Sequence, residues 1–432
     1  MEPQTTTAAI DDFEEDLIQM KIRGSTQEEL LTWLNNRGVV VSERTLRRRL
    51  RLWQEESPSS DNEQLINLID HLFHTQPTYS DDLISRRLRE DYNLQATARH
   101  IKTIRLRNSW LRRNNDLEAN QAQQAETTHL IHELLQEGQI RQYGRRYLIT
   151  RLARQHGHRA LGRHVRQALQ ILDNHNMTLR TPGMRRQRRE NYIVPGPDWL
   201  WCLDGHDKLA RYGIEIYGSV DAYSRKIIWF YVGVSNRTQV SVLHQYLHTI
   251  RTLGYCPNYL RTDRGRETPM MADAHYYLYH TACLHDDTIS DEAFDNICFA
   301  DCYLFGKSTS NVKIEGLWGQ LIAGQTEQWM LYFPRKLEAE GWWRDDFVCD
   351  TVILCFIFIP ILRREIFNWV ADKNAAPIRP QRHRSQHVSG IPNDLYRGSD
   401  DAPRQGFSFD LNLHAQLEAN VAGFGKPHHT AL

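Results

Sequence analysis

The sequence predicts an α/β core domain that is preceded by small all-α units and followed by a helical extension. Apolar residues recur at helical spacing through the first 190 residues, strand-like apolar runs begin at residue 200, and a long apolar helix is expected over 349–370. With 432 residues, 41% of them apolar and 25% charged, the chain can form several domains and bury a sizeable core.

The first helical unit is expected over residues 1–58. Ser25 is placed to cap a helix over 26–36 and Ser42 to cap a second helix over 43–54. Two helices joined by a short turn are typical of a helix-turn-helix, whose second helix enters the major groove of DNA. The candidate DNA-contacting residues on that helix are Arg44, Arg47, Arg48 and Arg51. A solvated basic helix is the alternative interpretation.

Two further helical units are expected over 61–125 and 126–190. The second unit has helix patterns at 64–73, 81–91 and 97–113 after a linker at 55–63, and the third has them at 146–157 and 160–173. Although the formal net charge of the chain is zero, thirteen arginines and one acid lie between residues 141 and 189. This asymmetry predicts a nucleic-acid partner and salt-sensitive, largely sequence-independent binding. The candidate contacts here are Arg145, Arg146, Arg163, Arg166, Arg185, Arg186, Arg188 and Arg189.

The core domain is expected over 191–345. Strands are predicted at 200–204, 214–222 and 226–234, followed by a helix at 238–254 and a strand at 259–263. Three strands, a helix and a fourth strand resemble the opening of a ribonuclease-H-like fold. Asp221 begins the connection between the second and third strands, and we assign it a turn role.

Two predicted strands end in aspartates, Asp204 and Asp263, and each is followed by a polar turn that contains glycine. If these strands are neighbours, the two carboxylates converge at one edge of the sheet, which is costly without a cation. A third acid, Glu315, lies at the border of an amphipathic helix over 311–322, with Asn311 one turn before it and Gly319 one turn after it. Hard carboxylate oxygens suit Mg²⁺ or Mn²⁺.

Several ordered blocks resemble integrase core domains, and more closely the transposon-derived integrase-like proteins of fungi and animals. The blocks are Trp201-x-x-Asp204-Gly205-x-x-Lys208-Leu209, 219-SVDAYSRKI-227, 261-RTDRGRE-267 and 310-SNVKIEGLW-318. The resemblance also covers the basic segments 144–157 and 163–173 and the segment 379–396, so that it extends over roughly residues 140–400.

The resemblance implies that Asp204, Asp263 and Glu315 are a DDE catalytic triad that binds two Mg²⁺ or Mn²⁺ ions. The ions would activate the attacking oxygen and stabilise the leaving oxygen of a phosphodiester in DNA 3′-end cleavage and strand transfer. His206 and Lys208 stand beside the first acid, where they could contact phosphate. Gly316 replaces an arginine usual in relatives, Arg266-Glu267-Thr268 stands where Gly-Glu-Asn is expected, and 270–305 is expected to be an insertion.

The expected partners are double-stranded DNA, both transposon ends and target, and further copies of the chain. A nuclear protein that is not in a membrane is expected, because the first residues lack a signal-peptide pattern and the apolar run at 351–362 is short and reads as a core helix. Seven cysteines without a CxxC pair indicate reduced thiols, and a zinc site at Cys283, His285, Cys298 and Cys302 is a weaker alternative. A helical extension is expected over 346–400 and a disordered tail over 401–432.

Two rival functions stay open at this point. One is a domesticated DNA-binding protein that keeps the fold but has lost catalysis, and the other is a metal-dependent nuclease that cleaves without joining. The complete set of three acids favours catalysis over the first rival, whereas the sequence does not separate a nuclease from a transferase.

Overall fold

The computed structural model describes residues 25–432 except 57–59, 113–116, 139, 141–142, 174–193, 264, 287, 307–310, 380–387 and 423–432, together with a few residues before position 25. The chain divides into two compact units, Met1–Arg112 and Arg113–Leu432. No helix in the described part of the chain is long and apolar enough to cross a membrane.

The first unit contains two small helical groups. The helices are α3 (Gln27–Asn35), α4 (Glu43–Glu56), α5 (Ser60–Thr75), α6 (Asp81–Tyr92) and α7 (Ala98–Arg107). Thr26, not the expected Ser25, caps α3, because its side chain and that of Glu29 form a reciprocal capping box. Ser42 caps α4 as predicted, since its hydroxyl accepts from the amide of Thr45 at 3.1 Å. The predicted linker at 55–63 is shorter than expected, because α4 and α5 both extend into it.

The second unit begins with three helices, α8 (Leu117–Gln136), α9 (Arg145–His156) and α10 (Gly162–Leu172). The last two match the predicted pair, whereas α8 lies across the expected boundary at 125 and 126. Their apolar residues, among them Leu148, Leu152 and Val165, belong to the same buried cluster as one face of the β-sheet. These helices therefore share a core with the sheet instead of forming an isolated domain.

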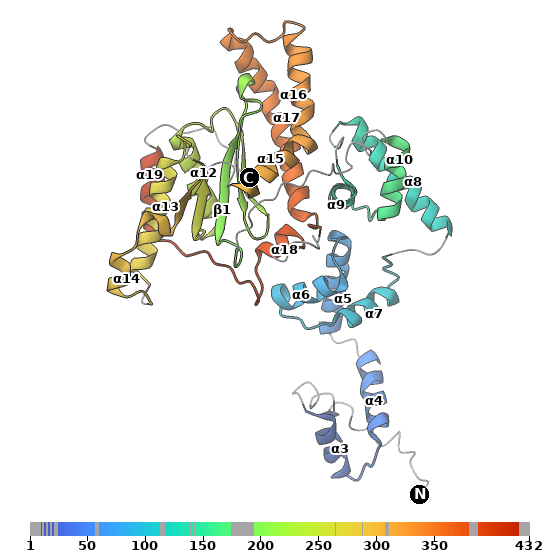
Figure 1. Cartoon of the computed structure of the whole chain (residues 1–432). Coiled ribbons are helices and arrows are strands. Elements are labelled where there is room, and N and C mark those ends of the chain that lie inside the picture. The colour runs from blue at the N-terminus through green and yellow to red at the C-terminus, as the bar shows by residue number, and fades with distance from the viewer. Residues whose placement is uncertain are drawn as a thin grey trace. The chain divides into compact units, whose positions relative to one another are not determined.

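A five-stranded mixed sheet forms the centre of the second unit, with the order β3-β2-β1-β4-β5 (Figure 1). Its strands are β1 (Leu200–His206), β2 (Glu215–Asp221), β3 (Ile227–Gly233), β4 (Tyr259–Thr262) and β5 (Tyr303–Phe305). The first three strands are antiparallel, while β4 and β5 run parallel to β1. This topology confirms the predicted ribonuclease-H-like class.

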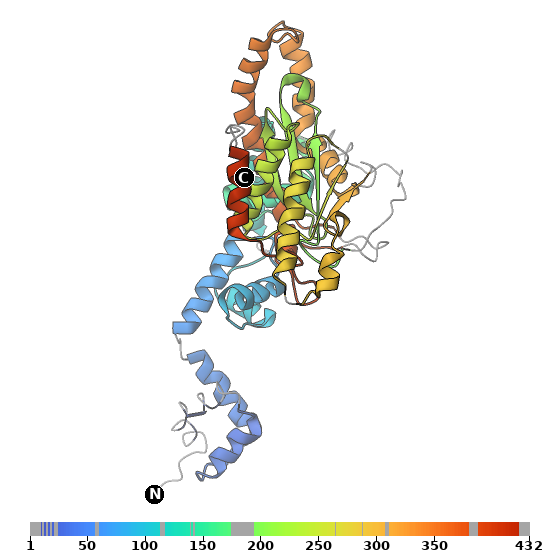
Figure 2. The same ribbon diagram turned by 90° about the vertical axis from the view of Figure 1, so that its left-hand side faces the viewer.

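Helices cover both faces of the sheet (Figures 1 and 2). One face packs against α12 (Gln239–Leu253), α13 (Pro269–Leu284) and α19 (Leu411–Ala422). The other packs against α15 (Val312–Leu321) and α17 (Val348–Ala375). The remaining elements are η1 (Ala210–Tyr212), α14 (Asp291–Asp295), η2 (Phe299–Asp301), η4 (Ile322–Thr326), α16 (Glu327–Tyr332), η5 (Phe333–Glu338) and α18 (Pro392–Tyr396).

Two expectations about segments outside the first four strands are wrong. Residues 270–305 are not a simple insertion, because they supply most of α13 and the edge strand β5, which completes the sheet. The expected disordered tail contains α19, whose Leu413 and Val421 are buried beside α12. The polar composition after residue 401 concealed these two apolar anchors.

The apolar helix α17 is a core helix over only part of its length. Leu354, Ile359 and Leu362 are buried, whereas Phe356 is 82% exposed. Val348, Val352, Ile353 and Ile357 are exposed as well. In both views the hairpin of α16 and α17 extends beyond the end of the sheet (Figures 1 and 2). The expectation of a fully buried run at 351–362 is therefore wrong for its first half.

Candidate active site

The two predicted aspartates lie on neighbouring parallel strands. β1 pairs with β4 in a register that places Leu200 beside Tyr259 and Cys202 beside Arg261. Continued by two residues, this register brings Asp204 opposite Asp263, which directly follows β4. Asp204 does not end its strand, however, because antiparallel pairing with β2 carries β1 on to His206.

Asp204 is partly buried and both of its carboxylate oxygens accept hydrogen bonds. The amide of Gly205 donates to Oδ1 at 2.9 Å, and the indole Nε1 of Trp318 donates to Oδ2 at 2.9 Å. The pKa of Asp204 is raised from 3.8 to about 7, chiefly by burial and also by the charges of Asp263 and Glu315, while the hydrogen bonds from Trp318 and Gly205 oppose the shift. Asp204 therefore lies within electrostatic reach of both other acids.

Trp318 is a site residue that the sequence analysis did not identify. Its ring stacks on His206 with centroids 5.1 Å apart and meets Phe230 edge-on at 5.6 Å. Gly218 pairs with Asp204 across β2, and a Cβ at this position would lie only 3.1 Å from Cη2 of Trp318. A glycine inside a strand often marks such a close approach, so that Gly218 was the available signal.

Asp263 has a second acid nearby. Its Oδ1 accepts from the amide of Gly265 at 3.2 Å. The pKa of Glu267 is raised, first by burial and then by the charges of Asp263 and Asp207. The sequence did not indicate a role for Glu267 at the site. In the structure it lies close enough to Asp263 to belong to the acidic edge of the sheet.

Glu315 lies in the first turn of α15 and is exposed. Its charge reaches Asp204, as the pKa of Asp204 shows. Among the described residues, no three His, Cys, Asp or Glu side chains are grouped closely enough to hold a metal ion. Asp263 and Glu315 thus lie near enough to affect Asp204 electrostatically, but the three carboxylates do not form a ligand cluster.

Asn311, one turn before Glu315, and His206, two residues after Asp204, are both buried. Asn311 donates from Nδ2 to the carbonyl of Leu203 at 2.9 Å, and its Oδ1 has no hydrogen-bond partner among the described residues. Burial lowers the pKa of His206 to about 4, with a further contribution from Lys208. His206 is therefore neutral near pH 7 and is a poor candidate for a charged phosphate contact, whereas Lys208 is exposed and remains one.

The candidate DNA-binding arginines differ in their surroundings. On α4, Arg44, Arg47 and Arg48 are exposed, and Arg47 forms an ion pair with Glu43 at 2.7 Å. The side chain of Arg51 and the whole of 185–189 lie outside the described residues. In the second unit Arg145, Arg163 and Arg166 are exposed, while Arg146 is partly buried and donates to the carbonyl of Pro377 at 3.0 Å.

Two arginines of the basic stretch have a structural role instead. Arg151 is 1% exposed and pairs with the buried Asp372 at 2.9 Å, and Arg154 pairs with the same carboxylate. Opposite charge and hydrogen bonds satisfy this buried acid. Asp372 consequently offsets one of these two positive charges within the fold, and the buried Arg151 is held there as a structural residue.

The turn role of Asp221 agrees with its contacts, because its buried carboxylate accepts from the amide and hydroxyl of Ser224, both at 2.7 Å. All seven cysteines are free thiols. Cys283 and Cys302 are buried, and burial raises the pKa of both thiols. These cysteines are not part of any metal-binding group within the described residues.

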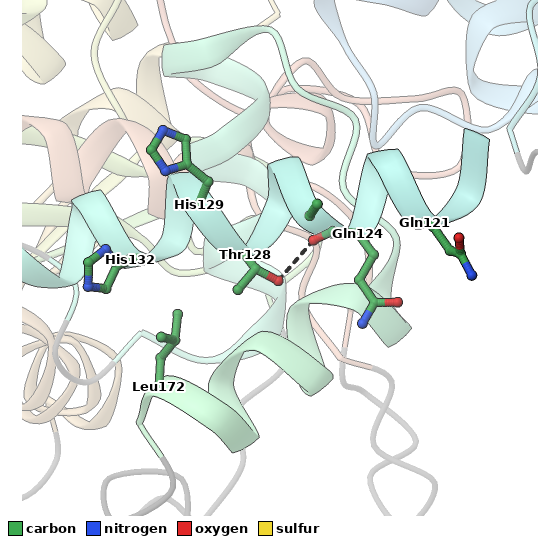
Figure 3. A pocket seen from close by; sticks show the side chains of 7 residues that line it. Gln121, Gln124, Thr128, His129, His132 and Leu172 are labelled. Atoms are coloured by element: carbon green, nitrogen blue, oxygen red, sulfur yellow. Dashed lines mark hydrogen bonds between the residues drawn. The ribbon is translucent and has the colours of Figure 1, made fainter. Parts of the chain in front are cut away.

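A cavity of about 640 Å³ lies between α8 and α10 (Figure 3). It is lined by Gln121, Gln124, Ala125, Thr128, His129, His132 and Leu172. Within it the hydroxyl of Thr128 donates to the carbonyl of Gln124 at 2.8 Å, an ordinary helix contact (Figure 3). This lining contains no carboxylate or cysteine, so we assign it no chemistry.

Comparison with known proteins identifies the central domain. Residues 191–396 match the family model of the integrase core domain, which confirms the resemblance carried by the motif blocks. A similar solved structure is the cryo-EM structure of the simian T-cell lymphotropic virus intasome in complex with PP2A regulatory subunit B56 gamma. It is 16% identical, the alignment covers 56% of this chain and 69% of that chain, and the TM-score is 0.25. No curated protein matches the chain.

Proposed function

We propose that this chain, whose residues 191–396 form an integrase core domain, is a DDE-type DNA integrase or transposase that cleaves DNA 3′ ends and joins them to a target. The observation that carries the proposal is the position of Asp204 and Asp263 on adjacent parallel strands, with Glu315 on the helix that packs beside them. Three acids at one sheet edge are the groups that metal-dependent phosphodiester chemistry requires.

The side chains at this edge have the type of donor atom that binds a divalent cation. They provide hard oxygen donors, and the unpaired Oδ1 of Asn311 is a buried acceptor close to the strand that carries Asp204. The raised pKa of Asp204 shows a carboxylate whose negative charge lacks compensation. We assign Asp204, Asp263 and Glu315 as the ligands of Mg²⁺ or Mn²⁺, in agreement with the two ions expected from the sequence. When bound, the ions supply activation of the attacking oxygen and stabilisation of the leaving oxygen.

The protein's own groups prepare the site for this reaction. Trp318 and the amide of Gly205 fix the two oxygens of Asp204, so that this carboxylate does not reorient freely. Asn311 holds the start of α15 against β1 through its bond to Leu203. Lys208 is placed to neutralise a strand phosphate beside the acids. Glu315, which is exposed, must turn its side chain toward the other two acids.

DNA binding is assigned to the basic side chains. Arg44, Arg47, Arg48 and Arg51 on α4 would contact DNA as a helix-turn-helix does, and the arginines of α9, α10 and 185–189 would contact phosphates. A nuclear location follows from this DNA substrate. We also assign a homo-oligomer, because the exposed apolar residues of α17 form an uncharged surface that can pair with its own copy.

The test is an incubation of the full-length protein with linear duplex DNA that carries the sequences flanking its gene, in Mg²⁺ or Mn²⁺. We expect recessed 3′ ends and joined products. Asp204→Asn, Asp263→Asn and Glu315→Gln should each abolish both products while DNA binding persists, because each removes a metal-ligating charge and little volume. Asp207→Asn is the matched control, since Asp207 is exposed in the neighbouring turn and pairs with Arg237 at 3.6 Å.

The products separate the rival functions. Nicked DNA without joined products would identify a nuclease, and DNA binding without any cleavage would identify a non-catalytic DNA-binding protein. Near wild-type cleavage by any of the three triad variants would remove that residue from the site.

A further inference from the structure

A second cavity, of about 540 Å³, lies where α9 and α10 begin. Arg145, Arg146 and Ile149 line it from α9, and Leu161, Gly162 and Arg163 line it from the start of α10. Three of its six lining residues are thus guanidinium cations, brought together from two segments that are 12 residues apart in the chain.

These three cations have no carboxylate partner among the described residues. The bonds of Arg146 and Arg163 are to uncharged groups: Arg146 donates to the carbonyl of Pro377 at 3.0 Å, and Nε of Arg163 donates to His164 at 3.3 Å. Arg151 and Arg154, on the same helix as Arg145, by contrast both pair with Asp372, which offsets one of their two charges. The fold therefore compensates part of the charge of α9 internally and leaves the three arginines at the cavity with their positive charge.

The helix termini add to this positive charge. Neither Gly144 nor Leu161, the N-cap residues of α9 and α10, provides a side-chain acceptor, and the first turn of neither helix contains an acid. The amides of both first turns and the positive ends of both helix dipoles thus stay uncompensated by side chains of these turns. A Cβ at Gly162 would lie in ordinary contact with Arg145, 3.5 Å from its Cδ, so a side chain introduced here would stand beside that guanidinium group.

We propose that this cavity binds a phosphodiester group of a DNA strand through Arg145, Arg146 and Arg163. Guanidinium groups form charge-assisted, often bidentate bonds with phosphate oxygens. The cavity is larger than a single phosphate needs, and Ile149 and Leu161 provide apolar surface for the adjoining deoxyribose. The assignment deepens the proposed function and rests on it, since it takes DNA to be the substrate.

Binding is measured with the full-length protein and a fluorescent duplex in EDTA, from 50 to 300 mM KCl, so that no catalysis is required. The decisive variant is Gly162→Glu, which adds a carboxylate next to Arg145 at the first position of α10. Its charge suits a helix N-terminus, so the melting temperature should stay the same or rise. DNA affinity should nevertheless fall about tenfold, and the slope of log K against log salt should decrease by about 1.

Two matched controls separate cavity charge from other effects. Gly162→Gln has nearly the same size without the charge and should bind DNA almost as the wild type does. Arg145→Gln/Arg163→Gln should reproduce the loss caused by Gly162→Glu. Arg335→Gln/Arg364→Gln removes two exposed charges elsewhere and should have a clearly smaller effect.

The outcomes distinguish this site from the proposed function. If Gly162→Glu binds DNA with the affinity and salt slope of Gly162→Gln, the cavity assignment is wrong while DNA binding by the chain stands. If the wild type fails to bind duplex DNA even at 50 mM KCl, the proposed function fails and this site fails with it. If inorganic phosphate at fixed ionic strength raises the melting temperature of the wild type but not of Gly162→Glu, and their DNA slopes agree, the ligand is free phosphate and the strand assignment is overturned.

Discussion

In the metal-free protein, the stability of the Asp204→Asn variant relative to wild type should increase as the pH rises toward 7. The pKa of Asp204 is raised from 3.8 to about 7, so the folded chain holds this proton more tightly than the unfolded chain does. Stability is unaffected by this group below pH 3.8, falls as pH rises from 3.8 to 7, and stays at the lower level above 7. At about 1.36 kcal/mol for each unit of pKa, the full penalty is at most about 4 kcal/mol.

Asparagine keeps the shape of the protonated acid, but only its Oδ1 can accept, so one of the two bonds donated by Gly205 and Trp318 is lost at every pH, at a cost of about 1 to 3 kcal/mol. The stability of Asp204→Asn relative to wild type should nevertheless rise by up to about 4 kcal/mol between pH 4 and pH 8, because only the wild type carries the buried charge at the higher pH. Urea unfolding in EDTA at pH 4, 6 and 8 measures the difference. The same difference at pH 4 and pH 8 would refute the assignment of an uncompensated buried charge.

Metal ions should remove the same penalty in a different way. A ligand that binds only the folded state at 10 to 100 times its Kd stabilises by about 1.4 to 2.7 kcal/mol. Mg²⁺, Mn²⁺ or Ca²⁺ should give wild type this gain and give Asp204→Asn little or none, while Asp207→Asn should respond like wild type. An equal gain in wild type and in Asp204→Asn would mean that this carboxylate is not a metal ligand.

Three further outcomes are expected. Trp318→Phe keeps most of the ring but removes the hydrogen bond to Asp204. The free energy of unfolding should therefore fall by about 1.5 to 3 kcal/mol at pH 8 and by less at pH 5, where Asp204 is protonated. Equal losses of unfolding free energy at both pH values in urea titrations would contradict this. Deleting residues 1–112, a compact unit, should reduce selection of specific DNA ends more than total affinity at low salt, because the arginines of α9 and α10 remain; loss of nearly all binding in a gel-shift titration would place the main phosphate contacts in the deleted unit. Phe356→Glu puts a charge on the exposed apolar surface of α17 and should lower the mass measured by light scattering, whereas Arg364→Glu on the same helix should not; an unchanged mass for Phe356→Glu would exclude this surface as the contact between copies.

Local pattern was sufficient to predict four of the five strands of the sheet, but not the short edge strand β5. The strands over 200–204 and 259–263 and the helix over 238–254 match β1, β4 and α12 within two residues at each end, because apolar periodicity and polar turns lie close together in sequence. The sequence did not predict the parallel pairing that brings Asp204 opposite Asp263; the convergence of the two acids was expected only if their strands were neighbours. It depends on contacts between segments nearly sixty residues apart, which no local pattern encodes.

The side chains that contact the acids and the arginines were harder to predict from sequence than the strands and helices. Nothing in the spacing of Trp318 indicates that its indole reaches Asp204, since this bond requires the absence of a side chain at Gly218 on another strand. Likewise, Arg151 and Arg163 belong to one basic stretch, yet only Arg151 meets Asp372, an acid 221 residues later in the chain. A count of arginines could not separate those that stabilise the fold from those that stay free to bind DNA.

The distribution of charge divides DNA binding from chemistry within one unit of the chain. The acidic edge formed by Asp204, Asp263 and Glu267 repels phosphate, so this edge alone cannot hold a DNA strand. Arg145, Arg146 and Arg163, which form no ion pair with a described residue, lie on helices that share a buried core with the sheet, and we expect them to hold a strand without a metal ion. Under the proposed function, cations that neutralise the acids would remove the local repulsion of the scissile phosphate. We therefore expect DNA to bind in EDTA and to be cleaved only with Mg²⁺ or Mn²⁺.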